Sequence, residues 1–280
     1  MKELKKFWNK INKNMTKVEI ASLSSLGYTI NEIKNGYIKS QDIQRKKFIE
    51  SKLTRWLEFS GNGILTFFDD EYPEYLKNIW KPPVVLFYKG NIHLLKKICF
   101  SVVGTRSMTA YGKSITEKFV KKLSEFFVIV SGMAIGIDAE AHKNSKQTIA
   151  VLGCGVDICY PKQNKYIYDK ISKEGCLISE YLPWENPKKH YFPLRNRIIA
   201  GISEGVLIVE CKKKSGTMIT ANYAIDFGKD LFTVPGNIFS LNSEGPNFLI
   251  KNGAYPVTDP DEILDFYMMR GVINESNRKN

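Results

Sequence analysis

The sequence predicts an α/β fold built on a mostly parallel sheet. From about residue 99 onward, apolar runs of strand length alternate with amphipathic segments of helix length. The runs are rich in β-branched residues and nearly continuous, which is typical of parallel strands buried on both faces. We predict strands at 99–103, 128–130, 148–152, 176–178, 206–209 and 231–234, with helices at 113–127 and 220–227 between them.

The first 60 residues predict a small helical domain instead. They lack proline, and their apolar residues recur at helical spacing: Val18, Leu23, Leu26, Ile43, Phe48, Leu53, Trp56 and Leu57. Gly27 and Gly36 mark turns between short helices. A strand at 64–68 follows, and then a turn, the pair Pro82-Pro83 and a further strand at 84–88 that ends before Gly90.

Composition excludes several classes of protein. A chain of 280 residues with 43% hydrophobic and 12% aromatic residues is not disordered. No apolar run approaches the roughly 18 residues of a membrane span, and the basic start leads into polar residues rather than a signal-peptide core. Five scattered cysteines predict reduced thiols in a cytoplasmic protein without membrane contact. Three histidines and no paired cysteines predict no metal site, and we expect no cofactor.

The charge is strongly positive. Lysine and arginine outnumber aspartate and glutamate by 41 to 29, and residues 1–60 alone hold 13 basic and 6 acidic residues. Such an excess favours polyanions, including nucleic acids, nucleotides and anionic membranes. A lysine-rich proteome would give the same balance, so charge alone does not distinguish these partners.

Four predicted strands end in glycine-bearing loops, which contain Gly104-Thr105-Arg106, Ser131-Gly132, Gly153-Cys154-Gly155 and Ser215-Gly216-Thr217. Ligands of open parallel sheets bind beyond the carboxyl ends of the strands, where helix N-termini favour anions. We therefore predict a phosphate-facing edge, although the glycines could also simply close tight turns. A P-loop motif is missing and no GxGxxG is complete, which disfavours P-loop NTPases and dinucleotide oxidoreductases.

Two local patterns add candidates. Asp138 and His142 are four residues apart and could form an acid/base pair, or the aspartate could anchor a helix start. The segment PKKHYFPLRNR at 187–197 interleaves cations with Tyr191 and Phe192 between two prolines. Lysine and arginine bind phosphates while an aromatic ring stacks on a base, so we predict a rigid loop that binds a polyanion. A buried aromatic turn with a solvated charged rim is the alternative.

From about residue 61 to 256 the sequence resembles the DprA/Smf DNA-processing family. The resemblance is carried by SVVGTR, IVSGMAIGIDAEAH, TIAVLGCGVD, LISEY, FPLRNRIIAGIS and SGTMITANYAIDFGKDLFTVPGN, in this order. It implies an extended Rossmann-like domain at 61–256 that follows a small helical (SAM-like) domain at 1–60. It also implies a cytoplasmic homodimer that binds and protects single-stranded DNA in natural transformation, loads the RecA recombinase onto it and is not an enzyme.

The resemblance also implies the site residues. The DNA-contacting arginine of the family corresponds to Arg106, and the lysine and phenylalanine of its basic loop correspond to Lys189 and Phe192. The same motifs bring in Gly104, Thr105, Ser131, Gly132, Lys165, Arg195, Asn196, Arg197, Ser215, Gly216 and Thr217. The dimer contact is expected after Val234, near Phe248, Leu249 and Ile250.

Residues 257–280 are expected to form a short tail, without the winged-helix domain that family members often carry. The competing hypothesis is an enzyme of the nucleoside-monophosphate phosphoribohydrolase type. Those enzymes carry a glutamate after a glycine-threonine loop, whereas the corresponding position here is Thr220 and the loop begins with lysines. A sensor of mononucleotides is a third possibility.

Overall fold

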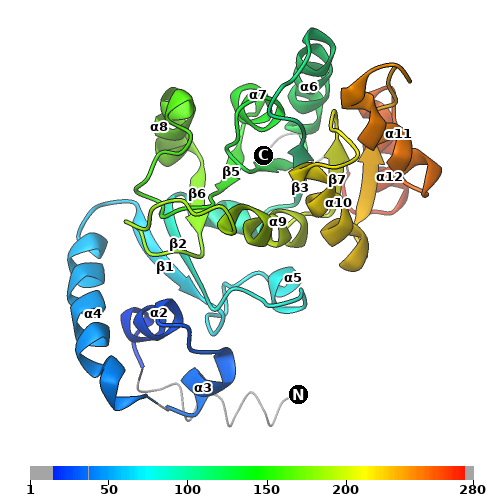
Figure 1. Cartoon of the computed structure of the whole chain (residues 1–280). Coiled ribbons are helices and arrows are strands. Elements are labelled where there is room, and N and C mark those ends of the chain that lie inside the picture. The colour runs from blue at the N-terminus through cyan, green and yellow to red at the C-terminus, as the bar shows by residue number, and fades with distance from the viewer. Residues whose placement is uncertain (1–14, 37, 275–280) are drawn as a thin grey trace.

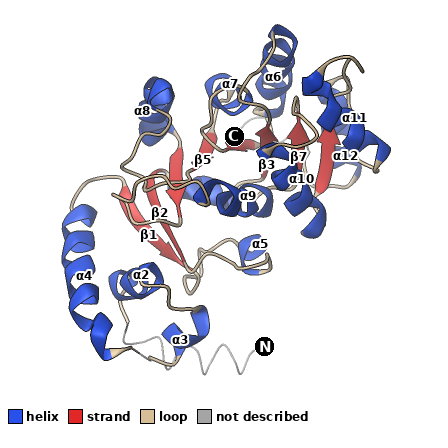
Figure 2. Cartoon of the chain, in the orientation of Figure 1, coloured by secondary structure: helices blue, strands red, loops and turns tan. Residues whose placement is uncertain are grey.

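The structure is a computed structural model that describes residues 15–36 and 38–274. Within them lies one nine-stranded sheet in the order β1-β2-β6-β5-β4-β3-β7-β8-β9 (Figures 1 and 2). Strands β3 to β9 pair in parallel, whereas β1 and β2 form an antiparallel edge. The predicted α/β fold with a mostly parallel sheet is confirmed. The strands are β1 (Asn62–Thr66), β2 (Val85–Gly90), β3 (Cys99–Val103), β4 (Val128–Ser131), β5 (Thr148–Val151), β6 (Cys176–Ser179), β7 (Gly205–Ile208), β8 (Asp230–Thr233) and β9 (Tyr255–Pro256).

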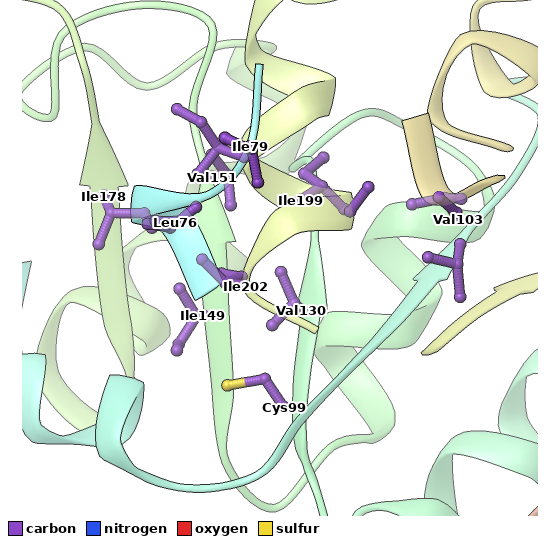
Figure 3. Close-up of a cluster of buried hydrophobic side chains, with 14 of the residues drawn as sticks. Leu76, Ile79, Cys99, Val103, Val130, Ile149, Val151, Ile178, Ile199 and Ile202 are labelled. Carbon is purple, nitrogen blue, oxygen red and sulfur yellow. The ribbon is translucent and has the colours of Figure 1, made fainter. Parts of the chain in front are cut away.

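Helices cover both faces of the parallel region. On one face α5 (Glu74–Lys77), α9 (Tyr191–Gly201) and α10 (Gly216–Asp226) pack on the strands. Figure 3 shows Ile199 of α9, and Ile202 directly after the helix, against Val130 and Val151 of the sheet. On the other face α6 (Ala110–Leu123), α7 (Ile137–Asn144) and α12 (Pro260–Met269) surround a second core that includes Phe100 and Phe232. The strands are therefore buried on both sides, as their continuous apolar runs require.

The N-terminal helices are α2 (Lys17–Ser25), α3 (Ile30–Lys34) and α4 (Ile43–Leu57). Thr16 and Thr29 begin α2 and α3 with capping boxes, each closed by a glutamate three residues later. Gly27 and Gly36 follow these helices with positive φ, as predicted for the turns. Leu53 and Trp56 of α4 share one core with Val85 and Phe87 of β2, so these helices pack on the edge of the sheet. Residues 1–14 of the predicted helical segment lie outside the described residues.

Three sequence expectations are corrected here. The predicted loop at 187–197 is a helix from Tyr191 onward, because Pro193 falls in the first turn, where no intrahelical N–H bond is needed. The expected tail after residue 256 contains α12, whose Ile263 and Tyr267 are buried in the second core. Leu249, in α11 (Glu244–Lys251), is buried and cannot form the expected dimer contact.

The remaining helix of this region, α8 (Lys165–Glu174), precedes β6. No helix within 15–36 and 38–274 is both long and apolar enough to cross a membrane.

Candidate functional site

A pocket of about 620 Å³ opens at the carboxyl ends of the strands, where the strand order reverses. The chain runs from β3 through β4 and β5 to β6, and then returns to β7 on the other side of β3. The loops after β3 and β7 therefore diverge, and a ligand site is expected between them. The pocket lining is Val103, Gly104, Thr105, Arg106, Ala134, Asp138, Tyr160, Lys189, Phe192, Pro193, Arg195, Asn196, Ile199, Ser215, Gly216, Thr217, Ile219 and Thr220.

The N-terminus of α10 forms one wall of this pocket. Ser215 precedes the helix in an extended conformation, and its side chain does not cap the first turn. The first amide groups of a helix have no intrahelical acceptor and carry partial positive charge. A Cβ added to Gly216 would meet no heavy atom within 4 Å, so the backbone here faces open space. This wall can receive a phosphate or another anion at short distance.

Two cations and two aromatic rings form the opposite rim. Arg106 and Lys189 are exposed, and neither has an ion-pair partner within 4.0 Å among the described residues. The Cζ atom of Arg106 lies 5.7 Å from the centre of the Phe192 ring. The Tyr160 ring is tilted by 39° to the Phe192 ring, with 5.6 Å between their centroids. Positive charge and flat apolar surface thus occur together at the mouth of the pocket.

A second pocket of about 730 Å³ adjoins the first and extends the site. The two share Arg106, Tyr160 and Phe192. The second pocket adds Lys162, an exposed lysine for which the described part of the chain holds no ion-pair partner. Neither Tyr160 nor Lys162 was among the sequence candidates. Tyr160 lies in the segment that follows β5, and only the packing of α9 shows that this segment faces Phe192.

Adjacent lysines at the start of α9 have different environments. The Lys188 ammonium lies 2.6 Å from a carboxylate oxygen of Glu185 and 2.8 Å from the hydroxyl of Tyr191. These two hydrogen bonds raise the pKa of Lys188 above its usual value. Lys189 instead lines the pocket. The chain thus places one lysine in an internal ion pair and leaves its neighbour available to a ligand.

The floor of the pocket is a buried charge pair. Nη1 of Arg195 donates to the carbonyl of Gly132 at 2.6 Å and also to the carbonyl of Val151. Burial lowers the pKa of Arg195 to about 10, so it remains charged at neutral pH. Burial also raises the pKa of Asp138, while the positive charge of Arg195 opposes this change. Arg195 therefore gives the floor positive character, but two of its hydrogen bonds are made to the protein.

Three of the five glycines in the predicted phosphate loops, Gly132, Gly153 and Gly155, do not line the pocket. A Cβ on Gly132 would come within 2.6 Å of the Arg195 guanidinium, and one on Gly153 within 2.7 Å of the Phe192 ring. These two glycines make room for side chains of α9. Of the four loops, only the loop before α10 has a glycine that both lines the pocket and leaves open space where a Cβ would stand. This glycine is Gly216. Gly104 also lines the pocket, and the contact of these loops with phosphate stays a prediction.

Ten of the fourteen sequence candidates line the first pocket: Gly104, Thr105, Arg106, Lys189, Phe192, Arg195, Asn196, Ser215, Gly216 and Thr217. Four do not. The Ser131 hydroxyl donates to the carbonyl of Val102 at 2.7 Å, and Gly132 lies beneath Arg195. Arg197 is buried and pairs with Glu180 at 2.6 Å, and Lys165 pairs with Asp169. The structure thus gives Arg197 a role in packing instead of a position in the pocket.

Asp138 and His142 do not form the acid/base pair that their spacing allowed. Asp138 accepts the N–H of Ala134 at 3.3 Å and so anchors the loop that enters α7. Nδ1 of His142 lies 2.7 Å from the Thr148 hydroxyl, and burial lowers the pKa of this histidine to about 3. Within the described ranges no cluster of three or more His, Cys, Asp or Glu residues could hold a metal ion.

Comparisons with known proteins identify the family of this chain. The family model of DNA recombination-mediator protein A matches residues 63–268. The DNA processing protein DprA of Streptococcus pneumoniae is 44% identical over 211 residues, which cover 74% of this chain and 75% of that protein. DprA of Bacillus subtilis is 38% identical over 250 residues, 87% of this chain and 84% of the relative.

Two solved structures are similar over most of the chain. The crystal structure of DprA from Streptococcus pneumoniae superposes with a TM-score of 0.75 at 37% identity and covers 92% of this chain and 95% of that one. A structure of DNA processing protein A from Helicobacter pylori, described for its single-stranded DNA binding mode, has a TM-score of 0.70 at 30% identity. It covers 75% of this chain and 96% of the other. The chain therefore belongs to the DNA recombination-mediator protein A family.

Proposed function

We propose that this protein binds single-stranded DNA in the two adjoining pockets. The observation that supports it best is the arrangement of Arg106, Lys189 and Phe192, because two exposed cations, unpaired among the described residues, line the same pocket as a partly exposed ring. The cations would hold phosphates, and the ring would stack on a base with little preference for sequence. The amides at the start of α10 would hold a further phosphate. The relative from Helicobacter pylori is described as binding single-stranded DNA.

Duplex DNA suits this site less well, because its bases are paired and cannot stack on Phe192 or Tyr160. The test is a set of binding isotherms for labelled oligodeoxythymidylates of increasing length, a matched duplex and free mononucleotides. We expect affinity to rise with length and to exceed that for the duplex. Equal affinity for mononucleotides and oligomers would support a nucleotide sensor, and tighter binding of the duplex would refute the assignment.

We further propose a role in natural transformation, in which the protein protects incoming single strands and loads the RecA recombinase onto them. Support comes from the family, whose model is described as a recombination mediator, and from relatives described as DNA processing proteins. Loading predicts that RecA filaments form faster on protein-coated strands than on strands coated by an unrelated binding protein. The proposal includes a cytoplasmic homodimer, and light scattering at micromolar concentration would test its mass.

The alternative, a phosphoribohydrolase-like enzyme, has little support from the site. Among the described residues that line the first pocket, Asp138 is the single carboxylate, and it faces Arg195. Glu210 is buried and accepts hydrogen bonds from the amide and hydroxyl of Thr109, at 3.0 and 2.6 Å. A general acid or base needs to reach the bond that breaks. Chromatography of nucleotides incubated with the protein should show no release of free base.

A further inference from the structure

A stripe of three cations and one exposed aromatic ring runs along α4, away from the pocket. The α4 stripe consists of Arg45, Phe48, Lys52 and Arg55, which are three, four and three residues apart. At 100° per residue these positions fall within about 80° of the helix circumference. Phe48 is 64% exposed, and Phe59, two residues after the helix ends, is 67% exposed. Both rings are therefore accessible to a ligand.

Among the described residues, the cations of the α4 stripe have no ion-pair partners, unlike another cation of the same helix. Lys46 pairs with Glu50 and lies 3.7 Å from Glu19. In the described ranges, no carboxylate lies within 4.0 Å of Arg45, Lys52 or Arg55. A merely solvated helix face usually alternates charge sign at this spacing. The α4 stripe therefore presents net positive charge to solvent.

The α4 stripe is linked to the loop that leads into the pocket. The Lys52 ammonium lies 4.2 Å from the centre of the Trp184 ring and 5.5 Å from that of Phe48. Trp184 lies in the loop between β6 and α9, which passes over β2 on the side of α4 (Figure 1). Lys189 follows five residues later, a span of at most about 18 Å. Rings and cations thus recur between the pocket and α4.

We propose that the α4 stripe is a second binding segment for single-stranded nucleic acid, which continues the path of a strand that leaves the pocket past Lys189. The inference rests on the proposed function and extends it. Phosphates would contact Arg45, Lys52 and Arg55, while the rings of Phe48 and Phe59 would stack on bases.

A membrane surface fits the helix less well. A membrane-bound amphipathic helix inserts its apolar face, whereas the apolar face of α4, with Leu53 and Trp56, is buried in the protein. A partner protein would be expected to cover a contiguous apolar patch, whereas the α4 stripe holds three cations and a single ring. Cations beside an exposed ring suit a chain that carries both phosphates and bases.

The test compares a short and a long oligodeoxythymidylate, of about 6 and about 25 nucleotides, by fluorescence anisotropy on the full chain. We expect the variant Phe48→Ala/Arg55→Ala to bind the long strand about tenfold more weakly and the short strand unchanged. Phe48→Tyr should keep the affinity of the native protein because its ring can still stack. The matched control is Lys47→Ala, which removes an exposed charge of the same helix outside the stripe, about 160° around the helix from Arg45 and about 80° beyond Arg55.

The outcomes separate the two proposals. If the double variant binds the long strand like the native protein while Lys189→Ala weakens both lengths, the α4 stripe is not part of the path and the pocket remains. If the double variant weakens both lengths equally, or Lys47→Ala weakens the long strand as much, the inference is also wrong. If Lys189→Ala weakens neither length, the pocket assignment itself fails. Thermal unfolding checks that each variant is folded.

Discussion

Replacing Lys189 by alanine tests the pocket assignment with a control that the chain itself supplies. Lys188 and Lys189 are adjacent, have the same charge and are both exposed. Only Lys189 lines the pocket, whereas Lys188 is held by Glu185 and the hydroxyl of Tyr191. Net charge, and with it any non-specific attraction of DNA, falls equally in the two variants. A difference in their affinity therefore reports the position of the charge.

The expected magnitude follows from one lost phosphate contact. A charge-assisted contact at a solvent-accessible rim contributes about 1 to 1.5 kcal/mol, so Lys189→Ala should weaken binding of single strands about fivefold to tenfold. The slope of log affinity against log salt should become shallower by about 0.7, the value for one phosphate on a single strand. Lys188→Ala should change the affinity less than twofold and leave the slope unchanged.

Anisotropy titrations at four salt concentrations measure both quantities, and thermal unfolding verifies the fold. Neither lysine side chain is buried, so the unfolding temperature of Lys189→Ala should match that of the native protein. Equal losses of affinity in the two variants would show that the protein attracts DNA by net charge alone. A larger loss for Lys188→Ala would place the strand on the Glu185 side of the loop and refute the pocket assignment.

Three further predictions concern the wall, the floor and the core. Gly216→Ala places a methyl group in open space, so it should leave the unfolding temperature unchanged or slightly higher while it lowers the affinity for oligonucleotides. Arg195→Met leaves the buried Asp138 carboxylate without its cation, which should lower the free energy of unfolding by about 3 kcal/mol. Adding Asp138→Asn should recover part of this loss, and chemical denaturation of the single and double variants measures both effects. The pKa of His142 in the fold is about 3, below its value in the unfolded chain, so the unfolded chain binds a proton first as the pH falls. The contribution of His142 to the free energy of unfolding is therefore complete above about pH 6.5 and falls by about 1.4 kcal/mol per pH unit as the pH drops toward 3. His142→Gln should remove this component, and urea titrations at pH 7 and pH 5 that show the same loss for both proteins would contradict it.

The N-terminal helices illustrate what a sequence pattern leaves open. Their spacing correctly predicted helices and the turns at Gly27 and Gly36. The same spacing suggested a separate domain, yet Leu53 and Trp56 complete a core with strand residues. Periodicity reveals which face of a helix is apolar but not what covers that face. In the same way, α12 has a clear apolar face, and only packing shows that it lies against the sheet.

The sequence by itself determined the fold class and most of the rim of the site. Continuous apolar runs require burial on both faces, and residues at the ends of parallel strands meet at one edge because all the strands point the same way. The motif segments thus brought Arg106, Lys189 and Gly216 into one pocket.

Only the tertiary structure decided which charges remain available. Arg195 and Arg197 stand in the same motif as Lys189, yet burial among carbonyls and carboxylates satisfies both. The tertiary structure also decided which glycines have open space beside them, because α9 packs Arg195 against Gly132 and Phe192 against Gly153. Local sequence encodes the chemistry of a side chain, whereas its accessibility depends on neighbours that are distant along the chain.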